Sequence, residues 1–392
     1  MTSAKTASLK EKTGPNTFPY GQADSPPESL LDSLRRRMDD IDAKLLNLLN
    51  QRAECSLEVG AYKRAHGLPV CAPIREKSLL EQVRDANAGP LSSSHLAAIY
   101  REILSASRDL QQPVRVAFLG PEGTFSHMAA QEQMGSCINA QPRGHLADVF
   151  AAVENGLCDL GVIPLDNSSN GAVGQSIDLF SAHQVYIQSE WYSRISLSLL
   201  GRGASLASIR TVYSHAQALG QCSGWLRQNL PQAEAVSVES TAAAAHLALS
   251  EKQAAAVGHR LLAAQTGLSL LQEGIEDTQD NWTRFCAITA RDTSAMAARS
   301  SAADKVSILF SVHDRAGSLA AVLQVLAAAG VNMIKLESRP MRHQRWKYIF
   351  FADVDSGPNP NACLAALEAV RALCTSFRIL GAYKAGESGG MV

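Results

Sequence analysis

The chain has 392 residues, with 36 basic and 37 acidic side chains and a formal net charge of −1 at pH 7. At roughly 100 to 200 residues per domain, this length predicts two to four domains, and the even charge balance excludes a bulk electrostatic attraction to nucleic acid or anionic lipid. The eight cysteines are scattered, without a CxxC pair or a close cluster with histidine, so we expect reduced thiols, no metal site and a cytoplasmic protein. No apolar run approaches the roughly 20 residues of a membrane span.

The N-terminal part is predicted to be a polar tail followed by helices. Residues 1–28 are rich in Pro, Ser and Gly and lack the apolar core of a signal peptide, which predicts a disordered tail. Within residues 29–112, apolar side chains recur every three or four positions from Leu34 to Tyr62, which predicts one helix of about 35 residues. Two shorter helices are expected to follow, the first from Pro73. Because these cannot cover so long an apolar seam, we expect a partner chain to cover it.

Polar residues interrupt this apolar pattern and indicate an anion site. Arg52 occupies a core position of the seam, and burying a guanidinium is costly unless an anion meets it. A salt bridge to a glutamate of another helix, or a solvated end of the seam, would also explain it. Glu76, at the start of the second helix, could accept a hydrogen bond from a ligand hydroxyl. Other polar side chains flank the seam or lie on the third helix, namely Arg35, Lys63, Ser107 and Gln111. Together these residues describe a site for a small polyanion.

The helical segment resembles a known family. The stretch LRRRMDDIDAKLLNLLNQRAECSLEVGAYK is similar to the first helix of the all-helical chorismate mutase domain. The resemblance implies a rearrangement of chorismate to prephenate that needs neither a nucleophile nor a cofactor. It also implies that Arg52 and Lys63 hold the substrate carboxylates. Arg35 would reach into the partner subunit's site, and Glu76 would contact the substrate hydroxyl.

By the same resemblance, Ser107 and Gln111 complete the pocket. Catalysis would come from holding the folded substrate, with Lys63 and Gln111 against the ether oxygen where negative charge develops. One position departs from the family, which usually has an aspartate four residues before Glu76, where this chain has Ala72. The substitution removes one hydroxyl contact and leaves open a catalytically idle helical domain that serves only for dimerisation.

Residues 113–291 alternate short apolar strands with amphipathic or alanine-rich helices, which predicts a mostly parallel sheet with sites at strand ends. The segment could form one doubly wound domain or two small lobes with a cleft between them. The turn GPEGTFSHMAA follows the strand VRVAFL and opens a helix, but it lacks both the GK[ST] of a phosphate loop and the GxGxxG of a dinucleotide site. Its backbone N–H groups and the hydroxyls of Thr124 and Ser126 suit a carboxylate as well as a phosphate.

Four further stretches, PLDNSSNGAVGQS, SHAQALGQC, ESTAAAA and DNWTRF, together with this turn resemble prephenate dehydratase over residues 114–290. The resemblance implies a two-lobed α/β fold of the periplasmic-binding-protein kind, with the Thr-Arg-Phe triplet in the cleft. Arg284 would bind a substrate carboxylate, Thr283 is the candidate proton donor to the leaving hydroxyl, and Phe285 would shape the ring pocket. The remaining implied substrate contacts are Thr124, Ser126, Asp166, Asn167, Ser168 and Gln217. The glycine turn is therefore expected to help bind a dicarboxylate and not a nucleotide.

Three residues of this segment need separate comment. Asp166 stands where the family has a glutamate, and a carboxylate one methylene shorter predicts weaker activity that is not abolished. His215 lies at a strand end, where it could act as a general acid or only stabilise the local structure. Cys222 falls on the following helix without an acyl-transfer context, so we do not interpret it as a nucleophile.

The C-terminal part consists of a predicted linker, residues 292–304, and a compact domain, residues 305–386. Its strand-helix-strand-strand-helix-strand order is that of the α+β ferredoxin-like fold. The stretches DRAGSLAAVL and LESRP resemble the two halves of the effector site of the ACT regulatory domain, with phenylalanine as the implied effector. The effector-binding residues so implied are Gly317, Ser318, Leu319, Glu337, Ser338 and Arg339. The last three could instead fix a dimer of these domains by salt bridges.

All three resemblances occur in the order of one family. We therefore predict a bifunctional chorismate mutase and prephenate dehydratase that is inhibited by L-phenylalanine. We expect a homodimer or higher homo-oligomer that acts on chorismate and prephenate, without cofactor, metal, nucleic acid or membrane. Two alternatives remain at this point: a prephenate dehydratase with an idle mutase domain, and a non-catalytic ligand sensor.

Overall fold

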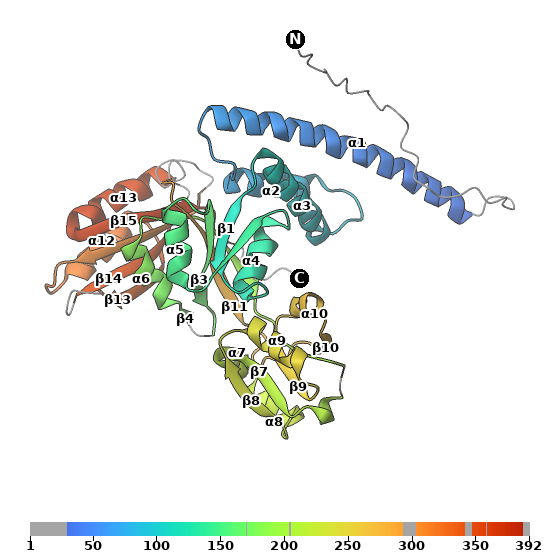
Figure 1. The fold of residues 1–392 in the computed structure, drawn as a ribbon. Coiled ribbons are helices and arrows are strands. Elements are labelled where there is room, and N and C mark those ends of the chain that lie inside the picture. Colours follow the sequence, from blue (N-terminus) through green and yellow to red (C-terminus); the bar gives the residue numbers. More distant parts are fainter. Residues whose placement is uncertain are drawn as a thin grey trace, which may run out of the picture. The chain divides into compact units, whose positions relative to one another are not determined.

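The computed structural model describes residues 30–169, 171–203, 205–292, 303–341, 347–357 and 359–386. The predicted tail and most of the predicted linker lie outside these ranges. The chain divides into two units, residues 1–55 and 56–392, and each is described by itself. Figure 1 shows the elements along the chain.

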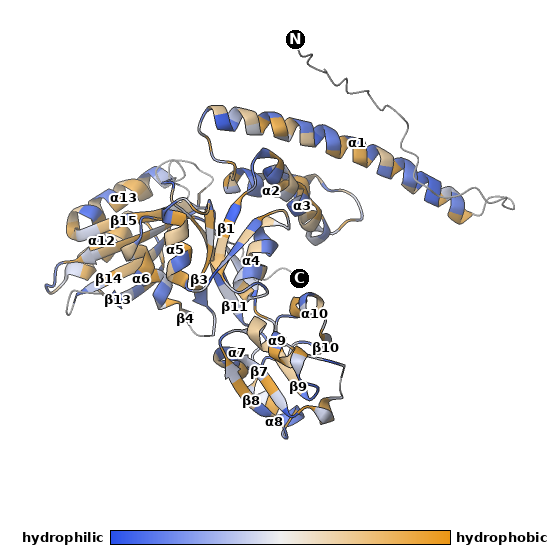
Figure 2. Cartoon of the chain, viewed as in Figure 1, coloured by the Kyte–Doolittle hydropathy of each residue, from blue (hydrophilic) through white to orange (hydrophobic). Residues whose placement is uncertain are grey.

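The N-terminal elements are three helices, as the spacing of apolar residues predicts: α1 (Leu30–Ala65), α2 (Pro73–Ala86) and α3 (Ser93–Gln111). Proline at the first position of α2 and the Ser92 cap of α3, which accepts a hydrogen bond from His95 N at 3.2 Å, set where these helices begin. Apolar residues recur along α1 (Figure 2), and the seam residues Met38, Ile41, Leu45 and Leu48 are each more than half exposed. In the described ranges no helix is both long enough and apolar enough to cross a membrane.

The middle segment folds as two lobes, each around its own sheet. The first-lobe sheet has the order β2 (Asn139–Arg143), β1 (Arg115–Leu119), β3 (Leu160–Asn167), β11 (Trp282–Thr289) and β5 (Tyr186–Arg194), with β4 (Gly171–Ala172) paired to β3. Its helices are α4 (Phe125–Met134), α5 (Leu146–Glu154) and α6 (Gly174–Ala182). The chain leaves this lobe after β5 and returns to it as β11.

The second-lobe sheet has the order β10 (Ser269–Gln272), β6 (Ser198–Gly201), β9 (Ala254–Gly258), β7 (Thr211–His215) and β8 (Glu234–Val238). A 3₁₀ turn (Leu206–Ser208) and the helices α7 (Ala216–Gln221), α8 (Ser223–Asn229), α9 (Thr241–Ser250) and α10 (Leu261–Thr266) complete it. The prediction of a mostly parallel sheet was wrong, since both sheets are mixed. In the first lobe the reason is the chain path: β11 re-enters from the second lobe and runs antiparallel to both β3 and β5.

The C-terminal domain has the predicted order of elements: β12 (Lys305–Val312), α12 (Ser318–Ala328), β13 (Met333–Pro340), β14 (Tyr348–Asp355), α13 (Pro360–Leu373) and β15 (Cys374–Tyr383). The strands form an antiparallel sheet in the order β13, β14, β12, β15. This is the ferredoxin-like arrangement.

The two faces of the C-terminal sheet pack against different partners. Side chains alternate along a strand, so Ile308 and Phe310 of β12 join a core with α12 and α13, whereas Leu309 joins a core with the first lobe. Phe351 and Tyr383 belong to the same first-lobe core and are at most 1% exposed. The C-terminal domain and the first lobe therefore share one apolar core, which fixes the two sheets against each other.

Candidate active site

Four predicted chorismate contacts, Lys63, Glu76, Ser107 and Gln111, lie in the unit that begins at residue 56. Lys63 Nζ donates to the carbonyl oxygen of Val70 at 2.8 Å. The Ser107 hydroxyl donates to the carbonyl oxygen of Ile103 at 2.7 Å. Among the described residues the side-chain oxygen of Gln111 is buried without a hydrogen-bond partner. Such a group requires an explanation, and a donor from a bound ligand would provide one.

Glu76 is held by an arginine that the sequence analysis missed. The Glu76 carboxylate forms an ion pair with Arg108 of α3, which is only 7% exposed and also donates to the carbonyl oxygen of Met134 in α4. Leu104 and Arg108 are four residues apart and both buried, so they form a second row on α3 beside that of Ser107. An arginine at a position of this buried row was the sequence signal that could have identified Arg108 as a partner of Glu76.

The remaining predicted residues of the mutase site, Arg35 and Arg52, lie on α1, and the departure from the family, Ala72, lies at the start of α2. Arg35 and Arg52 lie on the part of α1 that belongs to the first unit, where Arg35 pairs with Asp32 at 3.3 Å with a largely exposed side chain. Ala72 is the N-cap of α2 and provides no side-chain cap. An aspartate there would accept a hydrogen bond from a free backbone N–H. The departure at this position therefore removes a helix cap in addition to the implied hydroxyl contact.

The glycine turn before α4 lies against the second lobe. The Thr124 hydroxyl donates to the carbonyl oxygen of Leu119 at 2.8 Å and caps α4 by accepting from His127 N. Gly123 has φ +83° and its Cα faces the side chain of Leu262 in α10, where a Cβ would collide. The turn is therefore engaged in local capping and in the contact between lobes.

Two further predicted substrate contacts, Ser126 and Gln217, lie in the first turns of helices α4 and α7. Ser126 is buried in the first turn of α4. Gln217 lies in the first turn of α7 with its backbone N–H 3.3 Å from His215 Nδ1, so His215 caps this helix, which favours its structural interpretation. Burial raises the pKa of Cys222 to about 12, so the thiol stays protonated and is a poor nucleophile.

Strands β3 and β11 bring Asn167 and Thr283 together. The two residues are cross-strand partners, and Asn167 Nδ2 lies 3.0 Å from Thr283 Oγ1 and 2.8 Å from Asn281 Oδ1. Ser168 accepts from Trp282 N at 2.9 Å, which closes the end of the same strand pair. Thr283 is 8% exposed and Asn167 is 9% exposed. The hydroxyl predicted to donate a proton is thus held by the amide next to Asp166.

Phe285 lies deeper in the first lobe. It is 2% exposed, and its ring stacks on Trp191 with a centroid distance of 6.2 Å. A register shift between Arg284 and Phe285 marks a β-bulge in the pairing with β3, a feature that re-aims side chains near functional sites. The structure gives Phe285 a packing role, and its predicted contact with the substrate ring stays a prediction.

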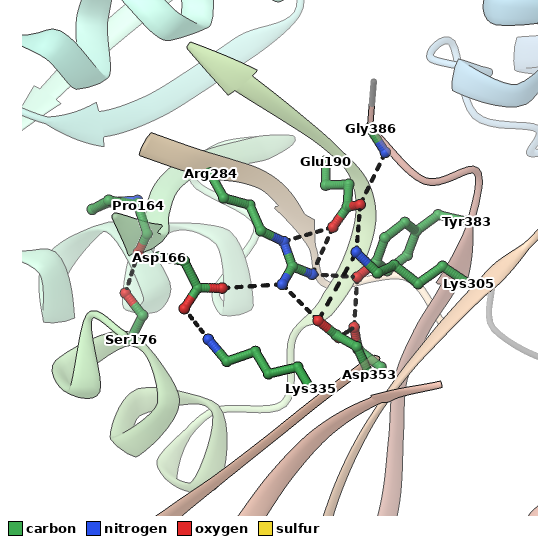
Figure 3. A network of polar contacts seen from close by, with 11 residues as sticks. Pro164, Asp166, Ser176, Glu190, Arg284, Lys305, Lys335, Asp353, Tyr383 and Gly386 are labelled. Atoms are coloured by element: carbon green, nitrogen blue, oxygen red, sulfur yellow. Dashed lines mark hydrogen bonds and ion pairs between the residues drawn. The ribbon is translucent and has the colours of Figure 1, made fainter. Parts of the chain in front are cut away.

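Arg284 is the centre of a buried network of ionic and polar side chains (Figure 3). Its guanidinium donates to Glu190 at 2.6 Å, to Asp166 at 3.1 Å, to Asp353 at 2.6 Å and to the Tyr383 hydroxyl at 3.1 Å. Glu190 and Asp166 come from the first lobe, whereas Asp353 and Tyr383 come from the C-terminal domain. The N–H groups of the guanidinium are used by these four partners, so the geometry does not favour a contact with a substrate carboxylate. That contact stays a prediction.

Two lysines of the C-terminal domain complete the network. Lys305 donates to Glu190 at 2.8 Å, and Lys335 forms an ion pair with Asp166. Burial raises the pKa of the Tyr383 phenol, so it is a neutral member. The sequence analysis missed both lysines. Lys305 stands at the edge of an apolar strand and Lys335 in an alternating one, and neither pattern identifies a partner in another domain.

The predicted effector residues lie on α12 and β13. Gly317 has φ +85° and is the N-cap of α12, while the backbone N–H of Ser318 donates to Arg315 O at 3.2 Å. Leu319 packs against the core between α12, α13 and the sheet. One of the backbone N–H groups at this helix start is therefore already used within the turn.

On β13, the alternation of side chains separates the other predicted effector residues. Glu337 and Arg339 lie on the partly buried face with Lys335, and Ser338 lies on the exposed face. Arg339 pairs with Asp178 of α6 at 3.2 Å. Arg339 thus joins the C-terminal domain to the first lobe, and direct effector binding by these three residues stays a prediction.

Comparison with known families covers each part of the chain. Family models match residues 34–112 as chorismate mutase type II, residues 116–293 as prephenate dehydratase and residues 306–372 as the ACT domain. A bifunctional chorismate mutase/prephenate dehydratase of Aquifex aeolicus is 37% identical over 90% of this chain and 97% of its own length. The chain belongs to this bifunctional family. It therefore has chorismate mutase and prephenate dehydratase domains and both activities, and the C-terminal domain is an ACT domain.

Solved structures agree for the dehydratase and ACT domains. A prephenate dehydratase of Arthrobacter aurescens in complex with L-Phe is 30% identical, with a TM-score of 0.64, and the match covers 71% of this chain and 92% of that one. A structure described as GqqA, a novel type of quorum quenching acylase, is 29% identical with a TM-score of 0.62, over 70% of this chain and 98% of that one. Since the two carry different activities in their descriptions, the fold alone does not decide the reaction. The reaction is assigned from the Aquifex aeolicus relative, which is similar over nearly its whole length and is named for both the mutase and the dehydratase activity.

Proposed function

We propose that the mutase reaction is carried out by the polar residues of the three helices acting on chorismate as a dicarboxylate. Arg52 and Lys63 bind the carboxylates, and Glu76, oriented by Arg108, accepts from the substrate hydroxyl. Gln111 and Lys63 stabilise the ether oxygen as the bond to it breaks. The buried, unpartnered side-chain oxygen of Gln111 supports a ligand at this place.

We further propose that α1 is covered by a second copy of the chain. The support is the row of seam residues that a single chain leaves exposed, Leu34, Met38, Ile41, Leu45, Leu48, Val59 and Tyr62. A helix with such a continuous apolar seam favours pairing with another helix. Arg35 would then reach the site of the partner. A dimer, or an assembly of dimers, in the cytoplasm is the form we expect.

For the dehydratase, Thr283 is the proposed proton donor, and one observation carries this assignment. Asn167 donates its amide to Thr283 Oγ1 at 3.0 Å, so the hydroxyl accepts there and its own proton remains available to the substrate. The bond from the ring to the carboxylate breaks to release CO₂, and its electron pair forms the new ring double bond. The ring hydroxyl leaves, takes the proton of Thr283 and departs as water, and solvent returns a proton to Thr283. The products are phenylpyruvate, CO₂ and water.

Further residues are proposed to bind the substrate of the dehydratase. Asp166 acts through its neighbour Asn167. Further polar contacts come from Thr124, Ser126, Ser168 and Gln217. L-Phenylalanine is the proposed inhibitor, bound by the ACT domain at the start of α12 and along β13, and this rests on the resemblance and on the relative solved with L-Phe.

The test is an assay of the purified protein with chorismate in one sample and prephenate in another. We expect phenylpyruvate from both samples and less of it when L-phenylalanine is present. Phenylpyruvate from prephenate alone would show that the mutase domain is idle, and turnover of neither substrate would contradict both assignments. A Thr283→Ala variant separates an enzyme from a sensor, because it should keep ligand binding while losing prephenate turnover.

A further inference from the structure

Strands β3 and β11 carry two functions on opposite faces at consecutive positions. Thr283 pairs with Asn167, and the next residue along β11, Arg284, pairs with Asp166. Because successive side chains of a strand point to opposite faces, the hydroxyl and the amide lie on one face. The guanidinium and the carboxylate lie on the other, toward the ACT domain (Figure 3).

Both oxygens of the Asp166 carboxylate are bound, each by a different domain. Oδ2 accepts from Arg284 Nη1 of the dehydratase domain at 3.1 Å. Oδ1 accepts from Lys335 Nζ of the ACT domain. The Asp166 and Lys335 side chains are only 20% and 21% exposed, so solvent screens this pair little. The backbone of Asp166 leads directly into Asn167, which holds the Thr283 hydroxyl.

The charges of the network balance only when the two domains are joined. The dehydratase domain contributes one cation, Arg284, and two anions, Asp166 and Glu190. The ACT domain contributes two cations, Lys305 and Lys335, and one anion, Asp353. Each side alone has a net charge of one unit, of opposite sign. Since an unpaired buried charge is costly, the dehydratase side depends on the ACT domain for its neutral, ordered state.

We propose that Lys335 is a positioning residue for the dehydratase reaction: through Asp166 it fixes β3 so that Asn167 holds the Thr283 hydroxyl, and effector binding along β13 slows the reaction by disturbing this ion pair. The inference rests on the proposed roles of Thr283 and of the ACT domain. It adds the residue through which the ACT domain acts on the catalytic strand.

A second contact from the same strand supports this coupling. Arg339 lies four residues after Lys335 on the same face of β13 and pairs with Asp178 of α6 at 3.2 Å and 3.3 Å. Its guanidinium lies directly against Gly174, where an added Cβ would require the Arg339 side chain to shift. β13 is therefore attached to the dehydratase domain at two points. A ligand that has different affinities for two placements of β13 shifts the equilibrium between these placements. Both ion pairs change with the placement of the strand.

The experiment uses the full-length protein with Lys335→Met, measured for dehydratase kcat and KM, for mutase turnover and for inhibition by L-phenylalanine. We expect kcat for prephenate to fall about 10-fold to 100-fold, as for a catalytic group displaced by a fraction of an ångström to an ångström, while KM changes less than about twofold. Mutase turnover should be unchanged, and it reports that the variant is folded. The inhibited and uninhibited rates should differ much less than in the wild type, because the effector then has no pair to disturb.

Two further variants make the outcome decisive. Lys335→Arg keeps the positive charge and should recover most of kcat, whereas Arg371→Met removes an exposed ion pair with Glu368 on α13 of the same domain and should change neither kcat nor inhibition. Unchanged kcat in Lys335→Met, or equal losses in the Met and Arg variants, would overturn the proposal. If Lys335→Met also loses mutase turnover, the variant is not folded, and the same kinetic measurements are made on Lys335→Gln. Failure of the wild type to turn over prephenate would contradict the proposed function instead, so the two failures are distinct.

Discussion

In the mutase domain the apolar seam of α1 and the predicted site residue Arg35 lie on exposed surface, whereas in the dehydratase domain the catalytic strand is enclosed on both faces by its own chain. The Arg35 side chain is 65% exposed, and the Arg284 side chain is 4% exposed. The same residue type is thus used in opposite ways. An exposed arginine beside the apolar seam can reach a second chain. A buried arginine needs all of its ion-pair partners within its own chain.

The contrast indicates how each activity is controlled. On the proposal that a second copy covers α1 and reaches the mutase site, this activity depends on assembly, and therefore on concentration. A dehydratase site that shares a core and an ion network with the ACT domain depends on the state of that domain within the chain. The predictions below test this difference, from the largest expected effect to the smallest.

Replacing the hydroxyl itself should have the largest effect, and only on one activity. In Thr283→Ala we expect kcat for prephenate to fall by about 10²-fold to 10⁴-fold, the range of a general acid. Mutase turnover of the same sample should not change. Thr283→Ser keeps a hydroxyl and serves as the matched control. If the Ala and Ser variants lose activity equally, Thr283 does not donate the proton.

Removing the buried guanidinium should destabilise the dehydratase and ACT domains. In Arg284→Met, the carboxylates of Asp166, Glu190 and Asp353 lose their shared partner, and breaking such a network costs about 3–5 kcal/mol. Urea unfolding followed by tryptophan fluorescence measures this, because Trp191 stacks on Phe285 beside the network. Arg194, exposed at the end of β5, provides the control variant Arg194→Met. An unchanged midpoint in Arg284→Met would mean that the network contributes no net stability.

Disrupting the α1 seam should affect only the mutase. Leu45→Lys places a charge on the exposed apolar row, and withdrawing each leucine from an interface costs about 1.5–3 kcal/mol, so association should weaken at least about tenfold. Sedimentation and mutase assays over a dilution series check this, with Asn47→Lys on another face of α1 as the control. Loss of mutase activity without a change in assembly would show that the seam serves some other purpose than pairing.

The smallest effect is expected at the second attachment of β13. Asp178→Asn breaks a partly exposed ion pair with Arg339, so the free energy of unfolding should change by less than about 1 kcal/mol. If Arg339 also contacts the effector, the two contacts compete, and the half-inhibitory concentration of L-phenylalanine should fall about twofold to fivefold. Inhibition curves measure this, with Glu368→Gln as the exposed control. A rise in that concentration would assign Asp178 to holding the inhibited state.

Much of the fold follows from sequence because it depends on local periodicity. The long apolar row of α1 and the strand and helix order of the ACT domain are patterns that neighbouring residues set. Periodicity alone left open the choice between one doubly wound domain and two lobes, because it depends on where the chain returns, and the two-lobed prediction that the structure confirms came from the family resemblance. The return of β11 between β3 and β5 is a long-range pairing that no local pattern encodes.

The candidate sites divide in the same way. Thr283 and Arg284 could be identified together from the triplet, but the expectation that both contact the substrate did not consider that consecutive side chains of a strand point to opposite faces. Glu190 is the single acidic residue of the strand YIQSEWYSR and directly precedes Trp191 and Tyr192, and a carboxylate beside large aromatic side chains is a signal of a buried partner. Lys335 gave no such signal, because its partner Asp166 is 169 positions away in another domain.

The most direct test of the central claim, that the ACT domain acts on the catalytic strands, is amide hydrogen exchange with and without L-phenylalanine in samples whose inhibition is measured in parallel. We predict that L-phenylalanine changes the exchange of peptides from β13, β3 and β11 together, while β7 and β9 of the second lobe do not change. In Lys335→Met the change should remain in β13 and disappear from β3 and β11. A change confined to the ACT domain of the inhibited wild type would contradict the account.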